Sequence, residues 1–201
     1  MTLYKVLGPN AESIHGGSGS WHKPSGKRPG KWMPVIEAPE CCQRGYHLVG
    51  VHALPEWLAA DCTIWEAEGR GASHADGNWK TAYAQARLLR RVHLSERDMR
   101  LFGADCAEHV VHLYEASYAS DDRPRQAIAA SRAYARREIG NEERAAVGAA
   151  AQVAAWAAAR AAVGTAAQAA ARAAAQTAAR TAERRWQGER LATYLDREGQ
   201  T

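Results

Sequence analysis

Apolar and polar residues follow two different periods along the chain, a short one in the first half and a helical one in the second. Short apolar or alternating stretches bounded by Gly, Pro and Asn are typical of strands. This pattern predicts four strands, at Thr2–Leu7, Trp32–Ile36, Tyr46–Val49 and Thr63–Glu68. Between the last two, Ala53–Ala60 is expected to form a short helix with Pro55 in its first turn.

A fifth strand is predicted near residues 81–88, where small apolar residues occupy every second position. These residues are Ala82, Ala84, Ala86 and Leu88. The alanine-rich composition would also suit a helix, but a period of two argues for a strand with one buried face. The N-terminal part is therefore expected to be rich in β-structure.

From Ser95 onward the spacing of apolar residues becomes helical. Ser95 and Asp98 resemble a capping box in which Asp replaces the usual Glu, and they predict a helix over residues 96–118. The run Asp121-Asp122-Arg123-Pro124 then ends this helix and begins another. The four further helices expected lie near residues 123–139, 142–163, 165–187 and 189–198, with breaks at Gly164 and Gly188.

Alanine dominates the last third of the chain. From Ala145 to Ala182, 23 of 38 residues are Ala, which has the highest helix propensity of all residues. One unbroken helix over this region would be long and would lack a coiled-coil seam, so a pack of shorter helices is expected. Because Ala buries little surface, Trp156 and Trp186 are predicted to lie in the core of that pack.

These patterns together predict an α+β protein with two modules. Residues 1–118 would form a small, β-rich mixed module, whose last helix, 96–118, bridges to the tail. Residues 119–201 would form an Ala- and Arg-rich helical bundle. Residues 1–118 carry 13 basic and 13 acidic residues, so the net charge of +4 arises entirely in the second module. A surplus of this size does not require a nucleic-acid partner.

Neither a signal peptide nor an 18-residue apolar segment is recognisable. The four cysteines have no C-x-x-C spacing and are expected to be free thiols. We therefore expect a soluble, cytoplasmic protein without a membrane partner.

The segment 21–32 is the first candidate binding site. Four cations lie there between two tryptophans, in a loop rich in Gly and Pro. Aromatic rings and cations together can hold single-stranded nucleic acid or a phosphate, whereas the alternative is a solvated loop whose rings return to the core. The residues are Trp21, Lys23, Lys27, Arg28, Lys31 and Trp32. Arginines of the tail form a second candidate surface, at Arg160, Arg172, Arg180 and Arg184.

Three further patterns carry possible chemistry. Glu66 and Glu68 form an E-x-E pair at the end of a predicted strand, as ADP-ribosyltransferases require, although this pattern is common by chance. Cys106 and His109 share a helical face, but zinc needs three or four converging ligands, so no metal is predicted. A dyad of Cys41 or Cys42 with His47 is a weaker possibility. We expect no catalytic residues and no cofactor.

Two parts of the sequence resemble known families. The stretches YKVLGPN, WHKPSGKRPGKWMP and RGYHL resemble an uncharacterised N-terminal domain of actinobacterial and phage proteins. The stretch DDRPRQAIAASRAYARREIG, followed by the Ala/Arg tail, resembles the helical Imm5-like immunity protein domain. This second resemblance implies a protein that binds a partner and has no catalytic residues.

The leading hypothesis is therefore a non-enzymatic protein-binding module of immunity or inhibitor type. Its partner would be a toxin or a defence effector, and inhibition of a host defence nuclease by a mobile element is a variant of the same idea. The alternative is a nucleic-acid-binding protein that uses residues 21–32 and the arginines of the tail. An enzyme of the ADP-ribosyltransferase type is the third possibility.

Overall fold

The computed structural model describes residues 2–59, 61–77, 80–116, 118–146 and 166–195. The chain forms two compact units. One comprises Met1–Leu94 together with Thr181–Thr201, and the other comprises Ser95–Arg180. The sequence had suggested a boundary at residue 118 instead.

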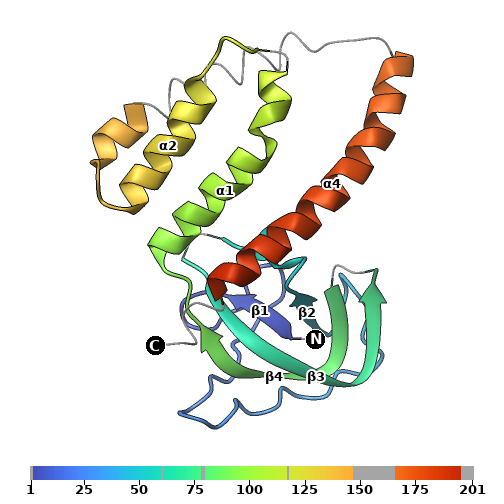
Figure 1. Ribbon diagram of the computed structural model, residues 1–201. Coiled ribbons are helices and arrows are strands. Elements are labelled where there is room, and N and C mark those ends of the chain that lie inside the picture. The colour runs from blue at the N-terminus through green and yellow to red at the C-terminus, as the bar shows by residue number, and fades with distance from the viewer. Residues whose placement is uncertain (1, 60, 78–79, 117, 147–165, 196–201) are drawn as a thin grey trace. The chain divides into compact units, whose positions relative to one another are not determined.

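The first unit is built on four antiparallel strands. They are β1 (Leu3–Leu7), β2 (Tyr46–Gly50), β3 (Thr63–Asp76) and β4 (Lys80–Val92). Each pairs with two neighbours in the order β1-β2-β4-β3, so the sheet closes into a small barrel (Figure 1). Strand β3 continues well beyond the predicted end at Glu68, because β3 and β4 form a long hairpin in which Asp76 pairs with Lys80.

The inner face of β4 confirms the period of two in the sequence. Ala82, Ala84, Ala86 and Leu88 are all buried. Ala86 and Leu88 belong to a core cluster with Leu7, Leu48 and Trp65. Small Ala side chains on the central strand leave room for the larger residues of the facing strands. The predicted short helix is a single 3₁₀ turn, η1 (Leu54–Trp57), that begins with Pro55.

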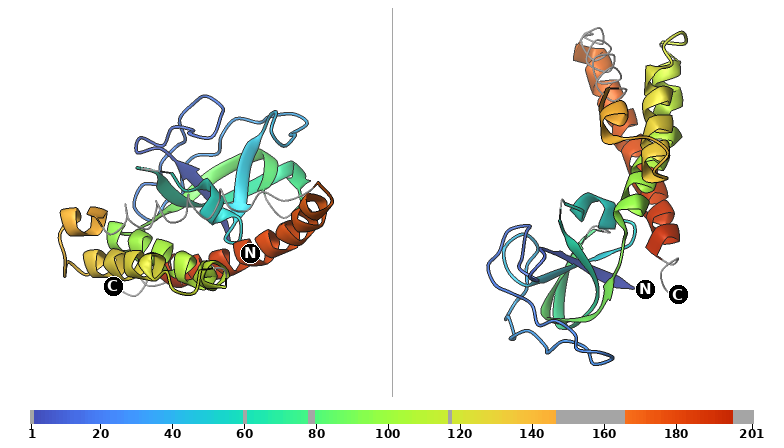
Figure 2. Two further views of the ribbon diagram at one scale, coloured as in Figure 1. Left: turned by 90° about the horizontal axis from the view of Figure 1, so that it is seen from above. Right: turned by 90° about the vertical axis from the view of Figure 1, so that its left-hand side faces the viewer.

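The predicted strand Trp32–Ile36 is wrong. This segment runs beside β4, but its backbone N–H donors are those of Gly30, Met33 and Ile36, three residues apart. A strand ladder needs donors at every second residue, and Pro34 has no N–H to give. The long connection between β1 and β2 therefore covers one side of the barrel as an irregular loop (Figure 2).

Helix α4 (Ala166–Leu195) runs without interruption through Gly188, so the predicted break there, and a separate helix 189–198, are wrong. Gly188 is buried, and a Cβ at this position would lie 2.3 Å from the Cα of His52. The glycine therefore allows close packing and does not end the helix. Leu191, Tyr194 and Leu195 are buried beyond it, and Trp186 is half-buried. Gly164 and Trp156 lie outside the described residues.

The second unit contains a helical hairpin. Helix α1 (Glu96–Glu115) begins at Ser95, whose Oγ accepts from the Asp98 N–H as the capping box predicted. Helix α2 (Arg123–Ala135) returns in the opposite direction beside it (Figure 1). Ala104, Val111 and Ile128 form their shared core. Helix α2 ends before the predicted residue 139, because Arg137 adopts a left-handed φ of 63°. Residues 141–146 are helical again.

Candidate functional site

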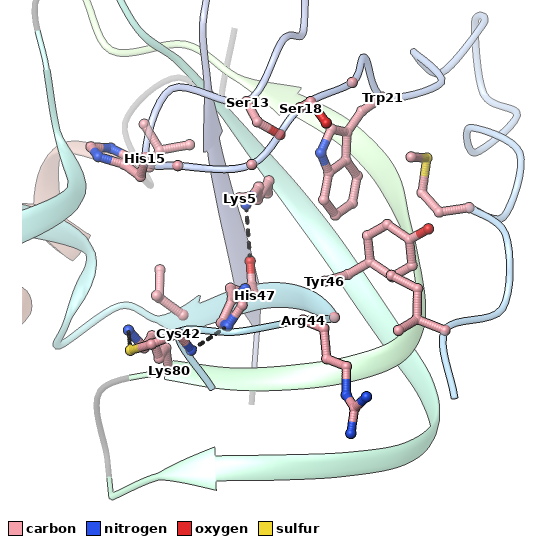
Figure 3. Close-up of a pocket in the computed structure, with 18 of the residues that line it drawn as sticks. Lys5, Ser13, His15, Ser18, Trp21, Cys42, Arg44, Tyr46, His47 and Lys80 are labelled. Carbon is pink, nitrogen blue, oxygen red and sulfur yellow. Dashed lines mark hydrogen bonds between the residues drawn. The ribbon is translucent and has the colours of Figure 1, made fainter. Parts of the chain in front are cut away.

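A cavity of about 490 Å³ opens in the barrel between β1, β2 and the glycine-rich loop that follows β1 (Figure 3). Its polar lining comes from both strands, from the loop at 13–19 and from the segment before β2. The lining residues with polar side chains include Lys5, Ser13, His15, Cys42, Arg44, Tyr46, His47 and Lys80. Trp21 and Trp57 contribute aromatic surface to the same cavity.

Lys5 projects from β1 toward this cavity, where its Nζ lies 3.3 Å from the carbonyl oxygen of His47 and 5.1 Å from the centre of the Trp21 ring. No carboxylate pairs with it among the described residues. Burial, which disfavours the charged form, lowers the pKa of Lys5 from 10.5 to about 8. A lysine in this environment is a poorly solvated cation close to neutral pH.

Cys42, His47 and Lys80 form a contact group beside Lys5 (Figure 3). The Cys42 N–H donates to Nε2 of His47 at 3.1 Å, and Nζ of Lys80 donates to Sγ of Cys42 at 2.9 Å. Burial lowers the pKa of His47, and the charges of Lys5 and Lys80 lower it further. The hydrogen bond to Cys42 raises the pKa of Lys80. Cys42 has a φ of 67°, a left-handed conformation that few residues other than Gly adopt.

The structure thus brings Cys42 and His47 together, as the dyad considered from the sequence requires. However, the thiol of Cys42 is not the group that contacts the imidazole of His47. His47 meets the backbone amide of Cys42, whereas the thiol meets Lys80. Cys41 turns to His74, with its Sγ 3.0 Å from the His74 carbonyl oxygen. Sequence reasoning did not single out Lys5 or Lys80, because β1 and β4 bring them to one cavity from positions 75 residues apart. The signal available was the cluster of glycines at 16–19.

The structure divides the predicted loop site, residues 21–32, into two parts. Trp21 is buried in the barrel core and packs edge-on against Tyr46, which is the alternative that the sequence left open. Reciprocal backbone bonds between Ser25 and Arg28 form a tight turn with Gly26 at a φ of 59°. The exposed cations along this segment are Lys23, Lys27, Arg28 and Lys31.

Trp32 lies apart from that turn, against the long hairpin. The guanidinium groups of Arg70 and Arg87 lie 3.9 Å and 4.6 Å from the centre of its ring. Each such contact contributes about 0.5–1 kcal/mol at an exposed site. Trp32 therefore has cationic partners within its own chain.

Among the tail arginines, only the side chain of Arg184 falls in the part of the chain that the structure describes. It forms an ion pair with Glu56 of η1 within the first unit. Arg160, and the side chains of Arg172 and Arg180, lie outside the described residues.

Glu66 and Glu68 have arginine partners on the neighbouring strand. Glu66 accepts from Nε of Arg90 at 2.7 Å, and Glu68 forms an ion pair with Arg87. Neither carboxylate lines the cavity. The E-x-E pair thus joins β3 to β4.

Over the described residues, the structure contains no group of three His, Cys, Asp or Glu side chains placed to hold a metal ion. This includes the face of α1 that carries Cys106 and His109. Within the same part of the chain, no helix is both long enough and apolar enough to cross a bilayer.

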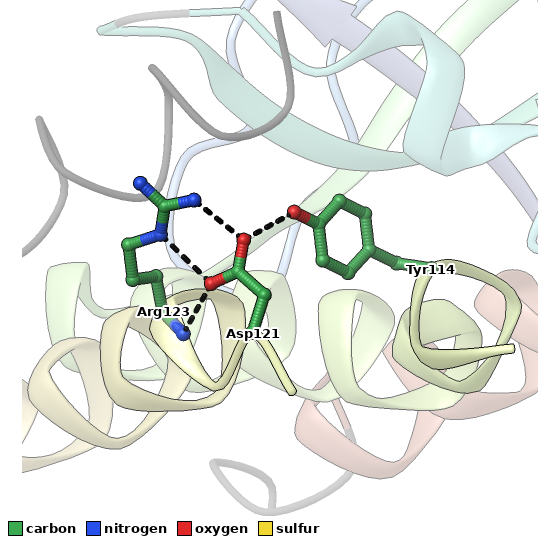
Figure 4. A network of polar contacts seen from close by, with 3 residues as sticks. All are labelled: Tyr114, Asp121 and Arg123. Atoms are coloured by element: carbon green, nitrogen blue, oxygen red, sulfur yellow. Dashed lines mark hydrogen bonds and ion pairs between the residues drawn. The ribbon is translucent and has the colours of Figure 1, made fainter. Parts of the chain in front are cut away.

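The residues DDRPRQAI at positions 121–128, which begin the stretch that carries the helical resemblance, join α1 to α2. Asp121 accepts from the Arg123 side chain at 2.7 Å and 2.6 Å and from the Tyr114 hydroxyl at 2.6 Å (Figure 4). The hydrogen bond from Arg123 holds the pKa of Asp121 well below its usual range, and that from Tyr114 adds to this effect. Ile128 then enters the core of the hairpin. The motif therefore specifies a helical turn.

Salt bridges extend this connection along the hairpin. Arg125 of α2 reaches Glu115 of α1 at 2.8 Å, and Arg132 reaches Asp105 at 2.8 Å and Glu108 at 2.6 Å. The same antiparallel register brings the apolar side chains of the two helices together in their shared core.

The comparisons with known proteins are consistent with this picture. Neither a search of curated proteins nor one of solved structures gave a significant match. The family match reported below does not extend over the barrel strands before Val92, so the resemblance stated for the N-terminal part stays a prediction. Residues 92–185, which include all of α1 and α2, match the family described as Imm-5 like putative immunity protein, which confirms the resemblance of the helical region to that family.

Proposed function

We propose that this protein acts in the cytoplasm as a non-enzymatic, protein-binding inhibitor of immunity type, which neutralises a toxin or a defence effector by binding it. The observation that carries the proposal is the family match over the helical hairpin. In one form of this function, a mobile element would encode the protein, and the protein would inhibit a defence nuclease of the host.

The exposed cations of the barrel unit support a docking role for its loop. Lys23, Lys27, Arg28 and Lys31 are exposed, and none pairs with an acidic side chain in the described part of the chain. Arg87 and Arg90, by contrast, are held by Glu68 and Glu66. Unpaired rim cations steer an acidic partner during encounter and contribute less to holding the complex. A protein partner with an acidic face fits this surface.

Affinity capture from host lysate, with and without nuclease treatment, tests the proposal. A captured protein should survive nuclease treatment, bind the purified chain and lose its own activity in proportion to the chain added. A toxin that binds but stays fully active would contradict the inhibitor role.

The variant Lys23→Ser/Lys27→Ser/Arg28→Ser/Lys31→Ser then tests the loop. It should lower the association rate more than it raises the dissociation rate. If a random oligonucleotide instead binds with a salt slope near −3, the value expected for about four phosphates of a single strand, the nucleic-acid reading would replace ours.

A further inference from the structure

The barrel cavity has a lining of unusual charge. Of the described residues that line it, three have basic side chains that are cationic at neutral pH, Lys5, Arg44 and Lys80, and none is acidic. His15 and His47 are the other titratable bases. We propose that this cavity is a binding site for a small organic phosphate that carries a planar ring, of the nucleoside monophosphate type.

Lys5 is the strongest argument for an anionic ligand. A cation that is partly withdrawn from water destabilises a fold unless a counter-charge pairs with it, and Lys5 is partly buried. Lys5 has only a carbonyl contact at 3.3 Å and a tryptophan ring beside it. An anion in the cavity would supply the missing partner. Lys80 adds a second cation to the lining, and its Nζ donates to the thiol of Cys42 and lies 5.3 Å from the centre of the Trp57 ring.

The glycine-rich loop offers donors for a phosphate. Gly16, Gly17, Ser18 and Gly19 all line the cavity, and their backbone amides donate to no acceptor in the described chain. The three glycines have φ values of 73°, 88° and 113°, and the space around each is open. Without Cβ atoms, this loop lets a ligand approach its amides closely, which is how glycine-rich loops hold phosphates.

The size and the aromatic lining decide which organic phosphate fits. A volume of about 490 Å³ lies in the range of small-molecule sites, roughly 300–1,000 Å³, and is too small for a polymer or a folded partner. Trp21, Tyr46 and Trp57 contribute ring surface, against which a flat base can stack. This site lies in the barrel and is separate from the family match over residues 92–185, so it goes beyond the protein-binding role.

Isothermal titration of the full chain with AMP and UMP tests the site, with adenosine and inorganic phosphate as partial ligands. We expect saturable one-to-one binding of at least one mononucleotide, at least tenfold tighter than either partial ligand. Lys5→Met and Lys80→Met should each weaken it tenfold or more. Arg91→Met, a matched loss of one exposed cation outside the cavity, should leave the affinity unchanged.

Lys5→Arg keeps the charge and should retain binding within a few-fold, and the circular dichroism of each variant verifies its fold. Three results would overturn the proposal: no binding of either mononucleotide at millimolar concentration, equal binding of mononucleotide and inorganic phosphate, or an affinity that Lys5→Met and Arg91→Met change alike. The last result would assign the binding to surface charge.

Discussion

Gly188 of α4 lies against His52 so closely that a Cβ added at Gly188 would be 2.3 Å from the His52 Cα and 3.0 Å from the Val51 carbonyl oxygen. Both neighbouring atoms belong to the backbone, so neither can rotate away. This single missing methyl group lets the last turns of a helix pack against the segment that follows β2. Two residues 136 positions apart in sequence, Gly188 and His52, are thereby in contact.

Gly188→Ala should therefore destabilise the protein by about 1–3 kcal/mol, as overpacking of a fitted contact does. Thermal unfolding followed by circular dichroism measures this change. Gly103→Ala is the matched control, because Gly103 lies in α1 with nothing within 4 Å of an added Cβ. It should stabilise by about 0.5–1 kcal/mol through helix propensity alone. If both variants behave alike, the close contact at Gly188 is absent.

Lys5→Met should stabilise the barrel at neutral pH, by about 1–3 kcal/mol, because it removes a partly buried cation that has no carboxylate partner among the described residues. The pKa of Lys5 falls from 10.5 to about 8 on folding, so the unfolded chain binds more protons between these values. Stability of the unchanged protein should therefore rise as the pH increases from about 8 toward 10.5.

Denaturant titrations across that pH range measure both effects. The pKa of His47 is lowered below its usual 6.5 and that of Lys80 is raised above its usual 10.5, so the difference between the two curves over this range follows the titration of Lys5. A destabilised Lys5→Met variant, or a difference that does not shrink above pH 8, would show that Lys5 is well solvated.

Asp121→Asn should lower the melting temperature of the helical unit at neutral pH, because the amide cannot accept both Arg123 and Tyr114 as a carboxylate does. The pKa of Asp121 is depressed in the folded state, so its contribution is present above the ordinary carboxyl pKa of about 4 and is lost as the pH falls below it. The difference from the unchanged protein should shrink over that acid range. Asp122→Asn, whose carboxylate accepts from Gln126, is the control and should have a smaller effect.

Ile128→Ala should destabilise the hairpin by about 2–5 kcal/mol, because its side chain is buried with Ala104 and Val111. Leu113→Ala removes a side chain of similar size that is 64% exposed, and should change stability by less than about 0.5 kcal/mol. Chemical unfolding monitored at the helical circular-dichroism band distinguishes the two. A large loss from Leu113→Ala in the isolated protein would mean that this face is covered by another part of the chain.

Local patterns in the sequence determined most of the secondary structure. The period of two over Ala82–Leu88 predicted β4 because one face of that strand is buried and the other is not. Ser95 and Asp98 marked the start of α1, since a helix start needs a local acceptor for its free N–H groups. The turn at Asp121–Pro124 could likewise be predicted from neighbouring residues. So could the resemblance of the helical region to the immunity protein family, which the match over residues 92–185 confirms.

Tertiary structure decided what Gly188, Trp32–Ile36 and Lys5 do. Glycine after a helical stretch usually ends the helix, but a requirement for close packing kept Gly188 inside α4. Trp32–Ile36 is a continuous apolar run like that of a strand, yet its N–H donors to β4, at Met33 and Ile36, are three residues apart. The cavity depends on closure of the barrel, because the pairing of β1, β2 and β4 brings Lys5 and Lys80 to one cavity. No acidic residue lines that cavity among the described residues. Each depends on distances between residues remote in sequence, and those follow from how strands and helices pack.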